Sequence, residues 1–230
     1  MSRLIRKWNL ITERNPKSPI SEGYRMLRTN IEFSTIDHKL QIIMITSSKP
    51  NEGKSTTCAN MAVSFAQANK RVLLIDADLR KPAQHHIFNI SNHKGLTTAL
   101  FNQQKPQDVI QHTNTENLSV ITAGPTKPNP SELLSSKHMG ALLEKMRETY
   151  DVIIIDTPSI MSVTDAQIVA TQSDGVVLVI ESGKVKKELV LKAKASLEHV
   201  QANLIGVVLN NINRNRSDSY SYYYGASNDA

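Results

Sequence analysis

The sequence has little cysteine, few aromatic residues and no long apolar run. Cys58 is the only cysteine among 230 residues, so no disulfide can form within the chain, as is typical of a protein in a reducing compartment. The longest apolar runs, Val152–Ile155 and Val176–Ile180, are far shorter than the roughly 20 residues of a membrane span. The basic N-terminus has no apolar stretch long enough for a secretory signal. We therefore expect a soluble cytoplasmic protein with one main domain.

The chain is basic, and its tyrosines cluster at one end. Lys and Arg number 27 against 21 Asp and Glu, a net charge of +6. This excess is compatible with solubility alone, or with nucleic acid, anionic lipid or an acidic partner protein. Aromatic residues make up only 5% of the chain, yet four of the six tyrosines lie in its last eleven residues. These are Tyr220, Tyr222, Tyr223 and Tyr224.

Apolar runs alternate with segments of helical periodicity. We expect strands at residues 40–46, 72–75, 118–122, 152–155, 176–180 and 204–209. We expect helices at residues 18–34, 54–68, 131–149, 165–171 and 184–200. Continuously apolar strands that alternate with helices predict an α/β fold with a mostly parallel sheet covered on both faces.

Three segments do not fit this alternation. Residues 1–17 show no clear period, and residues 83–116 give no readable pattern. Residues 212–230 are too polar to bury an apolar core of their own. The sequence therefore predicts a single domain over residues 1–211 and a flexible C-terminal tail over residues 212–230.

A phosphate-binding loop follows the first predicted strand. The segment SSKPNEGKST occupies residues 47–56, and the next predicted helix begins within it. A strand, a turn, Gly-Lys-Ser and a helix are the parts of a P-loop, in which backbone N–H groups and the helix N-terminus bind phosphates. We expect the nucleotide to contact Pro50, Asn51, Glu52, Gly53, Lys54, Ser55 and Thr56. Lys54 suits the β- and γ-phosphates and the Ser55 hydroxyl suits Mg²⁺, although Ser48 replaces the usual leading glycine.

Acidic residues end two other predicted strands. Asp76 and Asp78 follow residues 72–75, and Asp156 follows residues 152–155. The carboxyl ends of parallel strands meet at one edge, so these acids should lie beside the P-loop. The sequence thus predicts a P-loop NTPase fold of three layers that binds ATP and Mg²⁺, with Ser55, Asp78 and Asp156 as metal-side residues.

These motifs together resemble the bacterial tyrosine kinases, which are P-loop enzymes unrelated to eukaryotic kinases. The resemblance rests on the P-loop, on IDADLR at residues 75–80, on IDTP at residues 155–158, on EGYRMLR at residues 22–28 and on the tyrosine cluster. It implies autophosphorylation of the four C-terminal tyrosines, with Lys54, Asp76 and Asp78 as catalytic residues. A tyrosine hydroxyl has a pKa of about 10, so a carboxylate would help to remove its proton. From the residues alone either Asp76 or Asp78 is available, and the family implies Asp76.

The resemblance also implies partners. Glu22, Arg25 and Arg28 recur every third residue of a predicted helix within residues 17–35, which is equally consistent with an internal ion pair. In the family this pattern joins subunits into a homo-oligomeric ring that brings each tail to the next active site. Without membrane spans the chain resembles the split form, in which a separate transmembrane activator recruits the kinase to the inner face of the cell membrane. The implied context is synthesis and export of capsular or extracellular polysaccharide, with protein tyrosine substrates and a phosphotyrosine phosphatase.

The main alternative is a partition or septum-placement ATPase, a switch that binds DNA or membrane. Lys49 lies five residues before Lys54, where the variant P-loop of those proteins has an extra lysine. Pro50 stands where that loop has glycine, and the chain has no dense basic patch. We therefore expect a kinase and no nucleic-acid partner.

Three further features are less informative. Asn210, directly after the last predicted strand, either contacts the adenine base or forms a turn. Cys58 is expected in the core. The histidines lack the spacing of a metal site.

Overall fold

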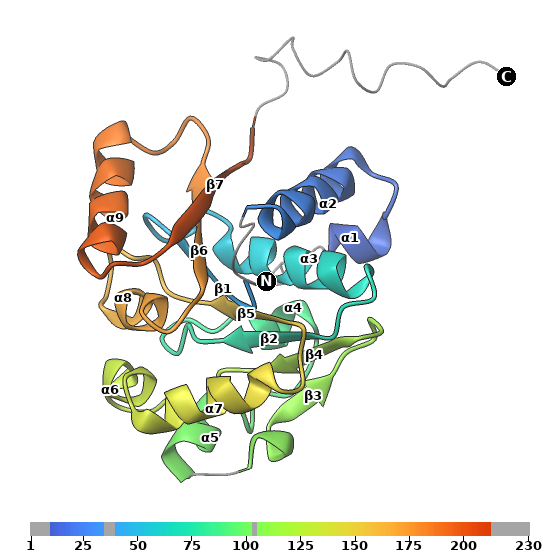
Figure 1. The fold of residues 1–230 in the computed structure, drawn as a ribbon, viewed down its shortest axis with the longest axis vertical. Helices are drawn as coiled ribbons and strands as arrows, with labels where there is room; N and C mark the ends of the chain where they lie inside the picture. Colours follow the sequence, from blue (N-terminus) through green and yellow to red (C-terminus); the bar gives the residue numbers. More distant parts are fainter. Residues whose placement is uncertain (1–9, 35–39, 103–104, 213–230) are drawn as a thin grey trace, which may run out of the picture.

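The computed structural model describes residues 10–34, 40–102 and 105–212. At its centre is a seven-stranded sheet with the order β3-β4-β2-β5-β1-β6-β7 (Figure 1). All neighbouring strands are parallel except β3 and β4, which are antiparallel. The strands are β1 (Ile42–Ser47), β2 (Val72–Asp76), β3 (Ile110–His112), β4 (Leu118–Ile121), β5 (Val152–Asp156), β6 (Gly175–Glu181) and β7 (Leu204–Asn210).

Helices cover both faces of the sheet and confirm the predicted three-layer fold (Figure 1). One face packs against α1 (Ile11–Arg14), α2 (Pro19–Glu32), α3 (Lys54–Ala66) and α4 (Gln84–Ile87). The other packs against α5 (Leu96–Asn102), α6 (Pro130–Leu134), α7 (Lys137–Arg147), α8 (Asp165–Ala170) and α9 (Lys187–His199). A short 3₁₀ turn, η1 (Pro106–Asp108), precedes β3. Within the described ranges, no helix is both long and apolar enough to cross a membrane.

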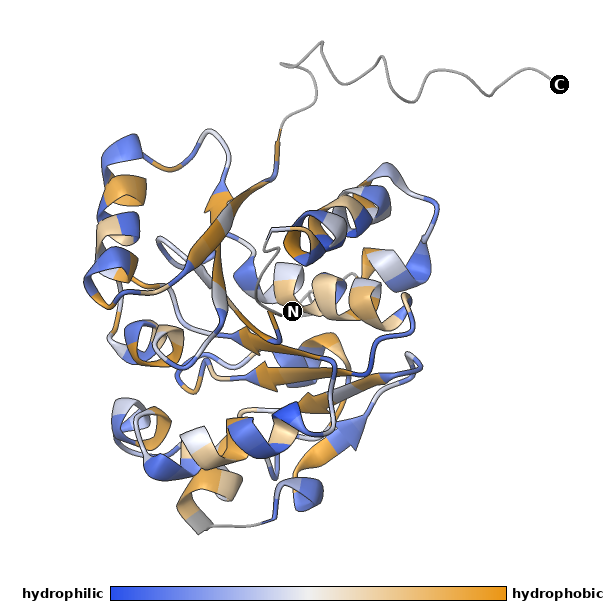
Figure 2. Cartoon of the chain, viewed as in Figure 1, coloured by the Kyte–Doolittle hydropathy of each residue, from blue (hydrophilic) through white to orange (hydrophobic). Residues whose placement is uncertain are grey.

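The central strands are apolar throughout because both of their faces are buried (Figure 2). In β1, Ile42 and Met44 belong to the core on the α5–α9 side, while Ile43 and Ile45 belong to the core on the α1–α4 side. Each such aliphatic side chain contributes about 1.5–3 kcal/mol when it leaves water. This two-sided burial holds the carboxyl ends of the strands in a rigid row.

The predicted helix at residues 18–34 is present as α2, and its exposed side includes apolar side chains. Ser18 is the N-cap, and its Oγ accepts a hydrogen bond from Ser21 N at 3.1 Å. Ile31 is buried, whereas Met26 is 50% exposed and Phe33 79% exposed. Met26 lies about 200° around the helix from Tyr24, so the two cannot share one face.

The predicted single helix over residues 131–149 is wrong. Two helices, α6 and α7, replace it, with a break at Ser135 and Ser136. Ser135 Oγ donates to Glu132 O, and Ser136 Oγ donates to Leu133 O at 2.7 Å. These hydroxyls compete for the carbonyl groups that a continuing helix would use, and Ser136 adopts an extended conformation.

The other corrections concern weakly patterned segments. α9 begins at Lys187 rather than at residue 184, and the unreadable residues 83–116 contain α4, α5, η1 and β3. The irregular lead-in contains α1, which is held by tertiary contacts: Thr12 N and Oγ1 both donate to Asn60 Oδ1. Short elements fixed by such distant contacts carry little periodicity of their own.

Candidate active site

The P-loop connects β1 to α3 and has two residues in the left-handed conformation. Asn51 has a φ of 68° and Gly53 a φ of 89°. A Cβ at Gly53 would lie 2.1 Å from Asn210 Nδ2, so no side chain fits there. The turn directs the first N–H groups of α3 into the loop, where a phosphate can bind them.

Glu52 stabilises the loop through its side chain. It is fully buried, and its Oε2 accepts hydrogen bonds from Ser48 Oγ and Lys49 N, both at 2.8 Å. Its Oε1 accepts from Glu181 N at 3.2 Å. The sequence indicated Glu52 only as a loop residue for nucleotide binding and missed this role. The signal was an acidic residue inside a loop that binds anions.

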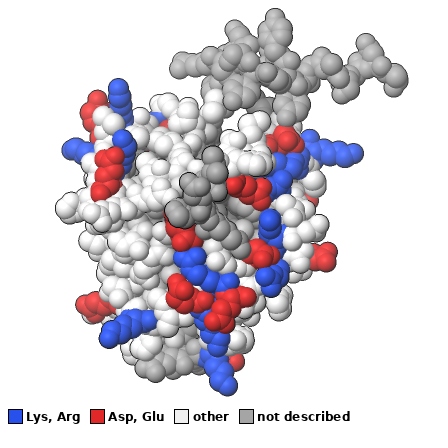
Figure 3. Space-filling view, viewed as in Figure 1, with Lys and Arg blue, Asp and Glu red and all other residues white. Residues whose placement is uncertain are grey.

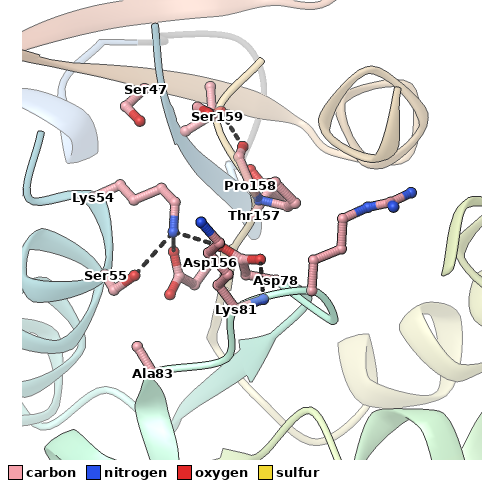
Figure 4. Close-up of polar contacts among 12 residues, drawn as sticks. Ser47, Lys54, Ser55, Asp78, Lys81, Ala83, Asp156, Thr157, Pro158 and Ser159 are labelled. Atoms are coloured by element: carbon pink, nitrogen blue, oxygen red, sulfur yellow. Dashed lines mark hydrogen bonds and ion pairs between the residues drawn. The ribbon is translucent and has the colours of Figure 1, made fainter. Parts of the chain in front are cut away.

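Lys54 lies among the carboxylates at the edge of the sheet (Figure 4). Its Nζ is 2.8 Å from Asp78 Oδ2, 3.6 Å from Asp156 Oδ1 and 3.1 Å from Ser55 Oγ. Burial lowers the pKa of Lys54, but the charges of Asp156 and Asp78 outweigh it and raise the pKa above its usual value. Lys54 is therefore a permanent cation at this edge. The structure brings together four residues that the sequence assigned to the site.

Asp76 faces the interior instead. It is fully buried; its Oδ1 accepts from Asp78 N, and its Oδ2 accepts from the N–H groups of Ala83 and Gln84 at 3.0 and 2.9 Å. Burial, together with the charge of Asp156, raises the pKa of Asp76 to about 8 despite these hydrogen bonds. Asp76 is thus a weak acid held by the backbone, with no surface for a substrate in this conformation.

Asp156 has one carboxylate oxygen without a hydrogen-bond partner. The side chain is fully buried, and its Oδ2 accepts from Gln84 Nε2 at 2.8 Å. Its Oδ1 is buried, makes no hydrogen bond within the described residues and lies 3.6 Å from Lys54 Nζ.

The donor set beside Lys54 fits Mg²⁺. It consists of the Ser55 hydroxyl and the carboxylates of Asp78 and Asp156, and hard oxygen ligands are what Mg²⁺ requires. In the described ranges no group of three or more His, Cys, Asp or Glu is arranged to hold a metal ion. Mg²⁺ bound with a nucleotide commonly needs only one or two carboxylates beside the phosphates.

Gln84 is the residue that the sequence missed. It is fully buried at the start of α4, and its Nε2 donates to Ser55 O at 3.1 Å as well as to Asp156. It lies in the segment without a readable pattern. Only its closeness in sequence to Asp76 and Asp78 could have indicated a role.

Asn210 lies at the end of β7 against the P-loop. Its Nδ2 donates to Glu52 O at 2.9 Å, and its Oδ1 accepts from Asn211 N at 2.9 Å. An amide group has two donor hydrogens and two acceptor lone pairs, so one of each is left for a nucleotide base. Both open interpretations of Asn210 are therefore compatible with this geometry.

The proposed oligomerisation residues already have partners within the chain. Arg25 NH2 is 2.6 Å from Glu22 Oε2 and donates to Pro16 O. Arg28 NH1 donates to Ser64 O at 2.7 Å, which joins α2 to α3. The internal Glu–Arg pair is thus present, and the contact between subunits remains a prediction.

Two further expectations can be placed. Cys58 is fully buried, as expected, and burial raises the pKa of its thiol well above the usual value. The predicted acceptors Tyr220, Tyr222, Tyr223 and Tyr224 lie outside the described residues.

Several known proteins are similar to this chain over most of its length. The family model of an AAA domain matches residues 40–207. The tyrosine-protein kinase YwqD of Bacillus subtilis (strain 168) is 48% identical, over 94% of this chain and 91% of its own. The putative tyrosine-protein kinase CapB of Staphylococcus aureus is 45% identical, over 91% of this chain and 92% of its own. The solved kinase domain of the Escherichia coli tyrosine kinase ETK has a TM-score of 0.87 and 36% identity, covering 97% of this chain and 89% of that one.

The fold and the site define a P-loop nucleotide-binding domain of the α/β class. Within that class, the chain belongs to the bacterial tyrosine-protein kinases, and it is a protein-tyrosine kinase. The predicted resemblance is confirmed.

The alternative ATPase class shares the fold alone. The septum site-determining protein MinD of Pyrococcus horikoshii OT3, solved with Mg-ADP, has a TM-score of 0.63 and 22% identity, covering 74% of this chain and 69% of that one. Lys49, the residue that favoured this class, donates to Lys184 O at 3.1 Å in its own chain. On the face in Figure 3, basic and acidic side chains are interspersed rather than gathered into one basic patch.

Proposed function

We propose that this kinase transfers the γ-phosphoryl group of Mg-ATP to the tyrosines of its own C-terminal segment, between subunits of an oligomer. One observation carries this proposal: the last strand ends at the P-loop. Asn210 contacts Glu52 and Gly53, so the chain leaves the sheet beside the phosphate site. The ten residues from Asn211 to Tyr220 span at most ~35 Å, since an extended chain advances ~3.3–3.6 Å per residue. Tyr220 and the tyrosines after it can therefore reach this site or that of a neighbouring subunit.

The phosphate-binding step uses the loop and Lys54. Backbone N–H groups of residues 51–56 surround the phosphates, and Lys54 exchanges its contact with Asp78 for phosphate oxygens. Ser55, Asp78 and Asp156 would hold Mg²⁺, which neutralises charge on the phosphates when it is bound. Phosphoryl transfer depends mostly on such positioning and neutralisation.

The proton of the tyrosine hydroxyl goes to Asp76 in this proposal. Only the ionised form of Asp76 can accept this proton, and its raised pKa makes that form a stronger base than an ordinary aspartate is. Because Asp76 is fully buried, the segment of residues 77–83 must open when an acceptor tyrosine enters. Its two contacts with Ala83 and Gln84 hold that segment closed.

The physiological setting is also part of the proposal. The family resemblance supports a transmembrane activator, a phosphotyrosine phosphatase and a role in capsular or extracellular polysaccharide synthesis at the inner face of the cell membrane. Phosphorylation adds about −1.5 to −2 charges per tyrosine, which gives a modified tail a means of leaving an acidic site.

The central test is mass spectrometry of the tyrosines after incubation with Mg-ATP, with and without a candidate activator segment. We expect phosphate on Tyr220, Tyr222, Tyr223 and Tyr224, and none on Tyr150, which is buried. Replacing the four tyrosines with Phe should remove the label, while Tyr150→Phe should not. A variant with four Phe residues that is labelled as strongly as the wild type contradicts the tail as the acceptor.

The oligomer has a separate test. Glu22→Ala with Arg25→Ala removes one helix-surface ion pair without touching the Arg28 contact with Ser64. We expect smaller species in sedimentation of this double variant. Its affinity for ADP should be unchanged. Arg71→Ala removes a comparably exposed pair with Asp151 and serves as the control. An unchanged sedimentation profile in the double variant excludes this surface as the subunit contact.

A further inference from the structure

Gln84 joins three parts of the site that are distant in sequence. Its Nε2 donates to Ser55 O, 29 residues away, and to Asp156 Oδ2, 72 residues away. Its backbone N donates to Asp76 Oδ2. One residue thus contacts the P-loop helix, the end of β2 and the end of β5. Neither the phosphate contacts nor the proposed base requires its side chain.

The amide orientation of Gln84 follows from its surroundings. Ser55 O and Asp156 Oδ2 are both acceptors, so only the NH₂ end of the amide can face them. The opposite atom, Oε1, is buried without a hydrogen-bond partner among the described residues. A buried acceptor left unpaired is unfavourable, so the two bonds that the amide donates must compensate for it.

The hydrogen bond from Gln84 makes the two carboxylate oxygens of Asp156 inequivalent. Gln84 holds Oδ2, and Oδ1 is left without a hydrogen bond on the side of Lys54. Rotation of the carboxylate would break the bond to Gln84, so Oδ1 is kept directed toward the place where a cation would bind. The same amide fixes the start of α3 at Ser55, the other Mg²⁺-side residue.

We propose that Gln84 is a positioning residue for Mg²⁺, which sets the orientation of Asp156 and its distance from Ser55. The inference rests on the nucleotide-binding part of the proposed function and does not depend on the tyrosine tail. Mg²⁺ demands near-ideal octahedral geometry, so it is sensitive to the orientation of a single carboxylate. Loss of a residue that orients a metal ligand typically costs 10–100-fold in metal affinity.

The test compares ADP binding with and without Mg²⁺ in the Gln84→Met variant. Met has a similar length, and the variant keeps the backbone N–H that holds Asp76. By isothermal titration calorimetry, we expect ADP affinity in EDTA to be unchanged and the gain in affinity from Mg²⁺ to fall about tenfold or more. No acceptor tyrosine takes part, so failure of tail phosphorylation leaves this result unaffected.

The matched control is Gln41→Met. Gln41 also bridges two acceptors, Arg147 O at 2.8 Å and Tyr150 O at 2.7 Å, at the opposite edge of the sheet. It should retain the full effect of Mg²⁺. The proposal is overturned if Gln84→Met also retains the full gain in ADP affinity from Mg²⁺, or if both variants lose that gain equally. It is also overturned if Gln84→Met weakens ADP binding in EDTA as much as in Mg²⁺.

A measurement on the wild type decides the question if Gln84→Met does not fold. The side-chain amide signals of Gln84 in ¹⁵N-labelled protein should shift when Mg²⁺ is added to the ADP complex. The signals of Gln41 should not shift. Unmoved Gln84 signals would overturn the proposal.

Discussion

The aspartates at the two edges of the same sheet have different charged partners. At the carboxyl edge, Asp78 and Asp156 share one cation, Lys54, while Asp76 is held by backbone N–H groups. At the amino edge each aspartate has its own arginine. Arg71 NH2 is 2.9 Å from Asp151, and Arg147 NH2 is 2.7 Å from Asp174.

The pKa shifts follow this difference in partners. Burial raises the pKa of Asp174, but Arg147 and the N–H groups of Ile42 and Gln41 outweigh it and lower the pKa below its usual value. Asp76 has no arginine partner among the described residues, and burial, together with the charge of Asp156, raises its pKa to about 8. Balanced charge at the amino edge stabilises the fold. The excess of negative charge beside Lys54 is what the proposed Mg²⁺ site would use, at a cost in stability.

Removing Lys54 should have the largest effect. Lys54→Met deletes the cation that contacts Asp78 and Asp156, and with it the proposed contact to the phosphates. We expect tyrosine phosphorylation to fall at least about 100-fold, since one charge-stabilising donor is commonly worth that much. Phosphotyrosine formed per minute in the presence of Mg-ATP measures it. Activity within a factor of a few of wild type would contradict the assignment.

Breaking the balanced edge should affect stability instead. Arg147→Met leaves Asp174, whose side chain is only 25% exposed, with backbone partners alone. Hydrogen bonds to charged groups contribute about 1.5–3 kcal/mol, so we expect the free energy of unfolding to fall by about 2 kcal/mol. Urea unfolding measures the loss, and phosphorylation by the folded variant should be unchanged. A large loss of activity with no loss of stability would show that the two edges are not distinct.

Neutralising one acid at the unbalanced edge should have a smaller and opposite effect on stability. Asp156→Asn reduces repulsion with Asp76, so the protein without nucleotide should gain about 1 kcal/mol, as is common when a strained functional site is relaxed. The additional thermal stabilisation that Mg²⁺ gives over ADP alone should disappear. Thermal unfolding with ADP, with and without Mg²⁺, measures both effects. Retained stabilisation by Mg²⁺ would remove Asp156 from the metal site.

The smallest expected effect is the pH dependence of the stability that Asp174 contributes at the amino edge. Asp174 has a lowered pKa when folded, so its stabilising contribution is present above its unfolded pKa of about 3.9 and is lost as pH falls through the folded value. The stability difference between wild type and Asp174→Asn should therefore be largest near neutral pH. It should shrink below about pH 4. Denaturant unfolding from pH 3 to 7 tests this, and a constant difference would contradict it.

The strong elements of the fold were predictable from local pattern. The parallel strands β1, β2 and β5 are apolar runs followed by polar turns, because both of their faces are covered. β3 was not predictable, since it has three residues and pairs antiparallel at the edge. The break between α6 and α7 depends on how two adjacent serines use their hydroxyls.

The candidate site divides in the same way. Lys54 and Asp156 were predictable because a Gly-Lys-Ser turn and a strand-end aspartate have local signatures. The arginine partners at the amino edge were not predicted. Arg71 and Asp151 each precede a strand, and only the pairing of β2 with β5 brings them together.

By itself, the sequence determined that a P-loop and three acidic residues share one edge of a parallel sheet, because strand direction and alternation with helices force those ends together. The tertiary structure decided which two acids contact Lys54, which one is held by backbone N–H groups, and how Glu52 and Gln84 hold the loop and Asp156. Those outcomes depend on contacts such as that between Gln84 and Asp156, 72 residues apart, and no local pattern records a contact over that separation.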